Sequence, residues 1–264
     1  MFCGGIILYY SSLLALELPE WLVDWLSDIG DQFYLNFLKD DRYMYIVKGL
    51  GITLLVTFLA VLLGIALGVL AAIIRSTHDK LITEMRSGFG KFILGALNFI
   101  TNLYLTVIRG TPVVVQLMIA YFVIFASSNN KVLVAVLAFG FNSGAYVAEI
   151  IRSGIMSIDQ GQFEAGRSLG FNFVQTMAYI IIPQAFKNVL PALANEFIVL
   201  LKETSVSGYI GLEDMTKGGD IIRSRTYSAF MPLLAVAAIY LLIVIFFSRL
   251  VALLERRLRN SERH

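Results

Sequence analysis

Long apolar runs dominate the hydrophobic pattern of this chain. Residues 49–74, GLGITLLVTFLAVLLGIALGVLAAII, contain no charged side chain, and about 20 apolar residues are enough to cross the hydrocarbon core of a bilayer. The run is too long for the apolar core of a signal peptide, and no small-residue cleavage site follows it. The pattern therefore predicts membrane-spanning helices rather than the core of a soluble domain.

About five segments are apolar enough to form transmembrane helices. They are residues 45–74, 92–126, 132–151, 173–201 and 231–254. Arg109 and Pro112 interrupt the second segment, so we expect its first part to lie at the membrane interface and residues 112–126 to be embedded. Pro183 and Pro191 should kink the fourth segment, because proline removes a helical hydrogen bond and clashes with the preceding turn. The predicted fold class is all-α and polytopic.

The composition supports a membrane protein and argues against several kinds of site. The chain is 58% hydrophobic and 15% charged, against roughly 45–50% and 25% for an average soluble domain. Its net charge of +2 gives no reason to expect a nucleic-acid partner. The two histidines, His78 and His264, lie far apart and the one cysteine is Cys3, so we expect no metal site and no internal disulfide. The sequence has no Gly-rich phosphate loop, so nucleotide energy would have to come from another chain.

Residues 1–44 differ in character from the rest of the chain. Residues 17–43 mix acidic side chains with aromatic ones such as Trp21 and Trp25. This pattern is typical of amphipathic segments at a membrane surface, where Trp and Tyr are enriched. We therefore predict an interfacial, extracytoplasmic extension over residues 1–44 and one transmembrane domain over residues 45–264.

The distribution of Lys and Arg predicts the orientation of the spans. Cytoplasmic segments of membrane proteins carry an excess of these residues. If the N-terminus is outside, the inner segments hold more cations than the outer ones, and the excess is clearest after the first and fifth spans. We predict an extracytoplasmic N-terminus, a cytoplasmic C-terminus and a cytoplasmic turn between the third and fourth spans.

That turn, RSGIMSIDQGQFEAGRSLGFN, has the local signals of a short helix. Asp159 is a good N-cap, Gln162 three residues later completes a capping-box pattern, and Gly170 can adopt the left-handed conformation that ends a helix. Spacing alone favours a capped connector at the membrane surface. Phe163 and Leu169, however, are apolar side chains outside the membrane, so they need a partner surface.

The sequence from the turn into the fourth span resembles the cytoplasmic signature of the membrane subunits of ABC importers. That signature is Glu-Ala-Ala, three residues, Gly, nine residues and Ile-x-Leu-Pro. The positions that match in register are Glu164, Ala165, Gly170, Ile180 and Pro183. Gly166 replaces the second alanine, which should loosen the helix by up to about 1 kcal/mol, and Ile182 replaces the leucine.

Three further segments are similar to the polar amino-acid branch of this family, the histidine, glutamine and arginine permeases. They are IRGTPVVVQL at 108–117, NSGAYVAEIIRSGI at 142–155 and NEFIVLLKETS at 195–205. Together with the signature they cover the chain from about residue 45 to its end. The resemblance implies a type I ABC importer-like fold with a cytoplasmic coupling helix over about residues 159–170.

The resemblance also implies partners and a place in the cell. The chain would be a permease subunit in a bacterial inner membrane, paired with an identical or different permease subunit. A cytoplasmic ABC ATPase, expected as a dimer, would bind ATP and Mg²⁺, while this chain would bind no cofactor. An extracytoplasmic binding protein would deliver the amino acid. The residues assigned to ATPase coupling are Asp159, Gln162, Phe163, Glu164, Ala165, Gly166, Leu169, Gly170 and Pro183.

Polar side chains near the end of the fourth span are candidates for the transport pathway. Polar residues inside a membrane are costly and often functional, and a zwitterionic substrate needs acceptors for its ammonium group and donors for its carboxylate. The candidates are Asn195, Glu196, Lys202, Glu203, Thr204 and Ser205. Lys202 and Glu203 fit an ordinary interfacial charge pair equally well.

Two other classes of function remain open at this stage. A self-contained channel or ion-driven carrier would work without an ATPase, but about five spans and a coupling-like helix argue against it. An intramembrane enzyme would need a nucleophile with a base, or metal ligands, within the spans, and the sequence offers no convincing set.

Overall fold

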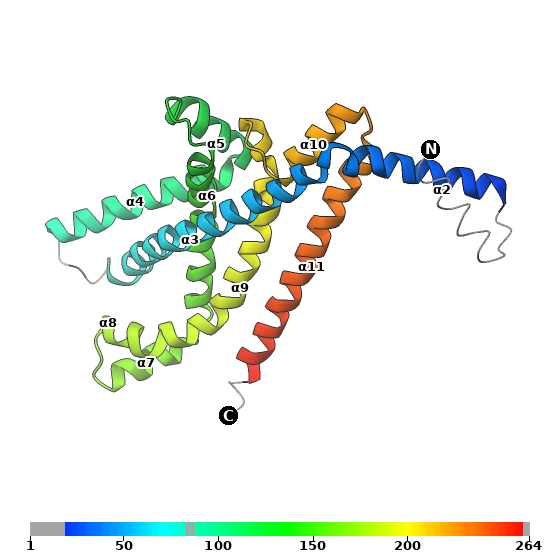
Figure 1. Ribbon diagram of the computed structural model, residues 1–264. Helices are drawn as coiled ribbons and strands as arrows, with labels where there is room; N and C mark the ends of the chain where they lie inside the picture. The colour runs from blue at the N-terminus through cyan, green and yellow to red at the C-terminus, as the bar shows by residue number, and fades with distance from the viewer. Residues whose placement is uncertain (1–18, 83–84, 86–87, 261–264) are drawn as a thin grey trace. The chain divides into compact units, whose positions relative to one another are not determined.

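The computed structural model describes residues 19–82, 85 and 88–260. Residues 1–18, which carry Cys3 and the first part of the predicted N-terminal extension, lie outside this description. Within the described residues the chain is helical and forms no β-strand (Figure 1). The predicted all-α fold is therefore confirmed.

Ten α-helices follow one another along the described chain. They are α2 (Glu20–Phe33), α3 (Tyr43–Leu81), α4 (Phe89–Gly110), α5 (Val113–Ile119), α6 (Lys131–Met156), α7 (Gln160–Ser168), α8 (Phe173–Thr176), α9 (Ile182–Glu203), α10 (Met215–Thr226) and α11 (Phe230–Asn260). Short π-helical turns occur at η1 (Tyr34–Leu38), η3 (Ala120–Ile124) and η4 (Met177–Ile181). Turns of 3-10 helix occur at η2 (Lys39–Asp41) and η5 (Thr204–Ile210).

Five helical stretches are long and apolar enough to cross a membrane, which confirms the predicted number within the described residues. They are Tyr43–Leu81, Phe89–Gly110, Lys131–Met156, Phe173–Ile210 and Phe230–Leu258. The predicted second span is wrong in its position. The spanning helix ends before Pro112, and the part after it is the short helix Val113–Ile124. At 1.5 Å per residue that helix rises only about 18 Å, too little to cross the bilayer core.

The described chain divides into two compact units. One comprises the described part of Met1–Ile52 together with Glu213–Leu241, and the other comprises Thr53–Leu212 with Leu242–His264, again as far as described. Two of the boundaries fall inside α3 and α11, and the third lies between η5 and α10. We predicted that the transmembrane domain begins at residue 45. The division into compact units does not test where that domain begins, so this boundary stays a prediction.

The first unit has a small apolar core with buried polar links. Asn36 is fully buried, accepts a hydrogen bond from Thr226 Oγ1 at 2.8 Å, and donates one to the Gln32 carbonyl at 2.8 Å. The bond from Thr226 joins the segment before α3 to the end of α10, and both bonds satisfy an amide that would be costly to bury alone. The apolar core residues are Phe37, Ile46, Met215, Ile222 and Val236.

Asp214 at the start of α10 and Asp220 within it have different roles. Asp214 is buried and caps the helix by accepting the backbone N–H of Thr216 and of Lys217. Burial raises the pKa of Asp214 to about 6, although these hydrogen bonds oppose the shift. Hydrogen bonds from Lys217 and Arg223 lower the pKa of Asp220. Asp220 is therefore an ordinary ion-pairing carboxylate, whereas Asp214 is a structural cap.

The second unit is built on close contacts between α3, α6 and α9 at small residues. A Cβ atom on Gly64 would lie 2.9 Å from Ser143 Cβ, and one on Gly68 would lie 2.6 Å from Val147 Cβ. Further along α6, a Cβ atom on Gly154 would collide with Val189 Cγ2 of α9. Small residues let membrane helices approach closely enough for van der Waals contact along their backbones. The interior position of α6 follows from these contacts.

Candidate functional site

The helix α7 occupies the turn in which the sequence predicts a capped helix. Asp159 is its N-cap, and its Oδ1 accepts the backbone N–H of Gly161 at 2.6 Å. The predicted capping box with Gln162 is wrong. Gln162 instead uses its Oε1 to accept a hydrogen bond from Gln184 Nε2 at 3.2 Å, which links α7 to α9.

The other end of α7 closes on a left-handed glycine, as predicted. Gly170 has φ +81°, and the Phe171 N–H donates to the carbonyl of Gly166 at 3.1 Å, the bond of a Schellman motif. A capping box does form one helix later. Asn172 Oδ1 accepts from the Gln175 N–H at 2.9 Å, and Gln175 Oε1 accepts from the Asn172 N–H at 3.0 Å. The chain therefore turns sharply from α7 into α8.

Gly166 lies where α7 contacts the helix that follows it. It is buried, and a Cβ atom there would lie 2.7 Å from Thr176 Cγ2 and 3.2 Å from Ile180 Cδ1. The sequence predicts only that glycine loosens α7 at this position. The structure adds that the missing side chain lets α7 approach α8 and η4, a contact that a single sequence does not reveal.

The apolar side chains of α7 point to different places. The Phe163 ring lies under the ammonium group of Lys80, with Nζ 4.6 Å from the ring centroid, and is only partly exposed. Leu169 is 70% exposed, and Glu164 and Ala165 are also exposed. The surface that α7 offers to a partner therefore contains Glu164, Ala165 and Leu169, while Phe163 connects α7 to the end of α3.

Pro183 and Pro191 occupy different positions in the fourth span. Pro183 lies in the first turn of α9, directly after the π-helical turn η4, whereas Pro191 lies inside α9. The first turn of a helix tolerates proline because its N–H groups have no intrahelical partner. Within the helical stretch Phe173–Ile210, Pro183 therefore follows the π-helical turn directly, and the predicted kinks at Pro183 and Pro191 stay predictions.

Two of the predicted pathway residues lie in helix interfaces. Glu196 is buried, and its Oε1 accepts a hydrogen bond from Ser143 Oγ at 2.9 Å, which joins α9 to α6. Thr204 is fully buried, and its Oγ1 lies 3.3 Å from Thr57 Oγ1 of α3. These bonds place polar groups of three helices inside the second unit.

The other predicted pathway residues do not join this interior cluster. Asn195 and Lys202 are exposed, and Glu203 and Ser205 are partly buried. The six candidates therefore lie along the end of α9 and the start of η5. Within one chain they do not form a single compact site.

Gln116 of α5 has a role that sequence reasoning missed. Its Nε2 donates to the carbonyls of Ile108 at 2.7 Å and Thr111 at 3.0 Å, and its Oε1 accepts from Asn142 Nδ2 at 3.0 Å. Gln116 therefore satisfies carbonyls that are freed at the end of α4. Its position four residues after a helix-breaking proline was the available signal.

Arg109 belongs to a chain of ion pairs that links three helices. Arg109 lies 3.3 Å from Glu149, which lies 3.9 Å from Arg152, which in turn lies 3.5 Å from Asp79. All four side chains are partly exposed, so each pair contributes at most about 1 kcal/mol. No group of His, Cys, Asp and Glu in the described part of the chain is arranged to hold a metal ion.

The contact between Gly166 and Thr176 leads to a test that separates two effects of glycine at position 166. One is the close approach of α7 to α8, and the other is the low helix propensity of glycine. Gly166→Ala should reduce the hydrogen-exchange protection of residues 160–176 by an amount equivalent to about 1–3 kcal/mol, because the new methyl group has no room. Thr176→Ala removes the opposing methyl group, and Thr176 Oγ1 has no hydrogen-bond partner among the described residues. The double variant should therefore recover most of the protection.

Helix propensity alone gives the opposite sign, because alanine favours a helix over glycine by about 1 kcal/mol. Increased protection in Gly166→Ala would show that the contact does not constrain α7. Gly51→Ala in α3 is a matched control, because nothing lies within 4 Å of a Cβ atom there.

A family model, "Binding-protein-dependent transport system inner membrane component", matches residues 87–260. The chain is 34% identical over 220 residues to the putative glutamine transport system permease protein of Rickettsia bellii, covering 82% of this chain and 94% of that protein. It is 35% identical over 221 residues to the arginine transport system permease protein of Bacillus subtilis, covering 83% and 94%.

Solved structures agree with this relationship. A crystal structure of an amino acid ABC transporter with histidines matches with a TM-score of 0.73 and 42% identity, over 84% of this chain and 98% of that one. An inward-facing structure of the MetNI methionine ABC transporter matches with a TM-score of 0.61 over 80% and 96%, and at 18% identity it shows the fold alone. The type I ABC importer-like fold is thus confirmed, and the chain belongs to the family of binding-protein-dependent transport system inner membrane components.

Proposed function

We propose that this chain forms the translocation pathway of an ATP-driven importer for a polar amino acid. The relatives that support this substrate class are named for glutamine and arginine transport, and the 42% identical structure is an amino acid transporter with histidines. The observation in the molecule that carries the proposal is α7, a capped helix with an exposed face that is fastened to α9. A self-contained channel or ion-driven carrier is not favoured, because the family consists of transport components that work with partners.

The exposed face of α7 is suited to contact an ATPase. Leu169 offers an apolar side chain and Glu164 a carboxylate. We propose that Asp159 and Gly170 fix the ends of this coupling helix, while the Gly166 contact and the bond from Gln184 to Gln162 pass its motion to α9. Phe163 carries the same motion to α3 through Lys80. The chain itself is a transport subunit, and ATP with Mg²⁺ binds to the ATPase.

The remaining partners and the orientation follow from the same proposal. A second permease subunit, identical or different, completes the pathway, a dimeric ABC ATPase lies in the cytoplasm, and an extracytoplasmic binding protein delivers the amino acid. We place the N-terminus outside and the C-terminus in the cytoplasm of a bacterial inner membrane. Residues 1–44 form the extracytoplasmic extension and residues 45–264 the permease domain.

We propose that the polar groups of α9 and η5 contact the amino acid in transit. Glu196 has one carboxylate oxygen bonded to Ser143, and its other oxygen is available to accept a substrate ammonium group. Glu203 offers a second acceptor, and Asn195, Lys202, Thr204 and Ser205 offer donors to a carboxylate. A second permease subunit would change which of these side chains face the pathway.

Reconstitution tests the proposed function directly. Proteoliposomes that hold this chain, its partner ATPase and the binding protein should import the amino acid only when ATP is present. Charge reversal at Glu164 (Glu164→Lys) or a bulky side chain at Gly170 (Gly170→Leu) should lower uptake at least about tenfold, because the first disturbs the contact face and the second cannot adopt φ +81° without strain. Stimulation of the ATPase by loaded binding protein should be lost as well.

Glu255→Lys is the matched control, since Glu255 is an exposed carboxylate of α11 remote in sequence from α7. Uptake driven by an ion gradient without the ATPase would refute the importer. Normal uptake and normal stimulated ATPase activity in Glu164→Lys and Gly170→Leu would refute the coupling role of α7.

The pathway assignment generates a separate prediction. Glu196→Gln preserves the shape of the side chain but removes its charge, so the KM for a zwitterionic amino acid should rise at least about tenfold in ATP-driven uptake. Glu203→Gln should show a smaller effect in the same direction. Ser143→Ala leaves the charge in place and serves as the control. If both glutamine variants keep the KM and substrate selectivity of the wild type, the pathway runs elsewhere.

A further inference from the structure

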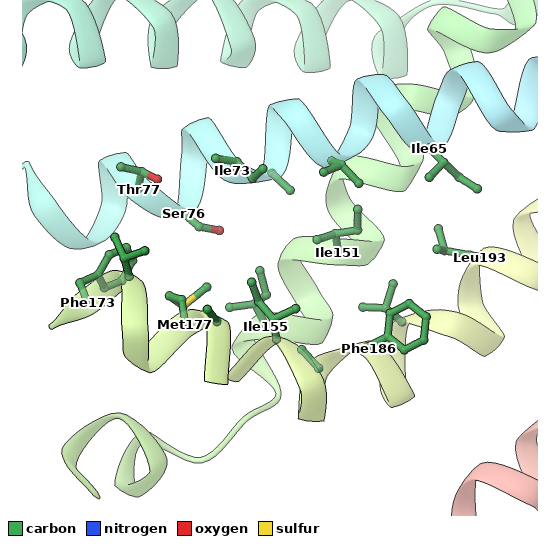
Figure 2. Close-up of a pocket in the computed structure, with 17 residues that line it drawn as sticks. Ile65, Ile73, Ser76, Thr77, Ile151, Ile155, Phe173, Met177, Phe186 and Leu193 are labelled. Carbon is green, nitrogen blue, oxygen red and sulfur yellow. The ribbon is translucent and has the colours of Figure 1, made fainter. Parts of the chain in front are cut away.

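A large apolar cavity lies between α3, α6 and the stretch from α8 to α9 (Figure 2). Its volume is about 450 Å³, within the range of pockets that hold small molecules. Figure 2 shows Ile73 and Ser76 on α3, Met177 and Phe186 on the opposite stretch, and Ile151 between them. Among its lining residues only Ser76 and Thr77 carry side-chain oxygen, and none carries side-chain nitrogen. A polar amino acid would therefore leave its charged groups unpaired there.

The close contacts of α6 explain why this cavity exists. α6 contacts α3 at Gly68 and contacts α9 at Gly154, so it fills the space behind the two helices. Some of the facing side chains of α3 and α9 are left uncovered by the described residues. Ile73 is 57% exposed and Phe186 is 55% exposed, although both line the cavity. In a membrane, hydrocarbon chains are the natural cover for such surfaces.

One end of the cavity carries a positive charge. A smaller hollow shares Ser76 and Met177 with the cavity and adds Lys80, Arg152 and Asp79. Arg152 is paired with Asp79 at 3.5 Å. Lys80 contacts the Phe163 ring, and no carboxylate of the residues that the structure describes forms an ion pair with it. Among the residues that the structure describes, the charge of Lys80 is thus unpaired at the mouth of an apolar slot.

We propose that this cavity binds an anionic phospholipid. One acyl chain lies between Ile73 and Phe186, and the phosphate lies at the ammonium group of Lys80. The apolar lining fits hydrocarbon, and a cationic group beside a slot between helices fits a lipid phosphate. The site is distinct from the proposed amino-acid pathway, and it borders Phe163, so the bound lipid contacts the same side chain that joins α7 to α3.

Native mass spectrometry of the full-length protein in mild detergent tests the proposal. The protein would be incubated with vesicles of phosphatidylglycerol or of phosphatidylcholine, and the lipid retained per chain would be counted. The wild type should retain one phosphatidylglycerol and prefer it over phosphatidylcholine. Lys80→Gln should weaken that preference about fivefold, since one cation near a membrane surface contributes on the order of 1 kcal/mol. Lys91→Gln should leave the preference unchanged.

Variants that fill the cavity test the position of the acyl chain. Ala178→Trp from η4 and Ser76→Leu from α3 should each abolish retention of both lipids, and two variants on different helices guard against misfolding of one of them. Leu103→Trp is the control, because it places the same bulk on an exposed part of α4. The protein with this substitution should retain lipid. Equal retention of the two lipids by the wild type, or wild-type retention in both filled variants, would overturn the proposal. So would disulfide cross-linking of Phe186→Cys between two copies, because protein would then cover the cavity.

Discussion

The close approach of α7 to α8 and η4 at Gly166 is the contact on which the proposed mechanism depends. A side chain as small as alanine would collide with Thr176 there, so the two segments pack this closely only while residue 166 is glycine. The hydrogen bond from Gln184 to Gln162 and the Schellman turn at Gly170 hold the same geometry from either side. Glycines in α3 and α6 repeat the principle inside the membrane domain, where backbones approach closely because side chains are absent.

These contacts connect the exposed face of α7 to the polar interior of the second unit. α7 is fastened to α9, α9 carries Glu196, and Glu196 is bonded to Ser143 of α6. Under the proposed coupling role, a force applied at Leu169 would reach the candidate pathway through these short contacts between packed helices. Phe163 provides a second route, to α3, and this route passes beside the proposed lipid. Under this proposal the lipid surroundings and the ATPase influence the same part of the molecule.

The sequence was sufficient to predict the helical fold, the number of spans and the capped helix before the fourth span, because these follow from apolar length and local capping rules. It was insufficient where distant residues meet. The second span was misplaced because Arg109 and Pro112 were taken to interrupt it, whereas α4 continues through Arg109, which pairs with Glu149 forty positions later. Gln162 was assigned to a capping box because its partner Gln184 lies on another helix. The role of Gly166 depends on Thr176, which no helix-propensity scale includes.

The most direct test of this account is whether α7 and α9 move as one body during transport. Spin labels at Ser168→Cys and Phe186→Cys, in a Cys3→Ser background, would report the distance between the two helices by pulsed electron paramagnetic resonance in the reconstituted complex. If α7 is fastened to α9, the mean distance should change by less than about 2 Å between the nucleotide-free and ATP-bound states. A change of about 5 Å, one helical turn, would contradict the account, because α7 would then move without α9.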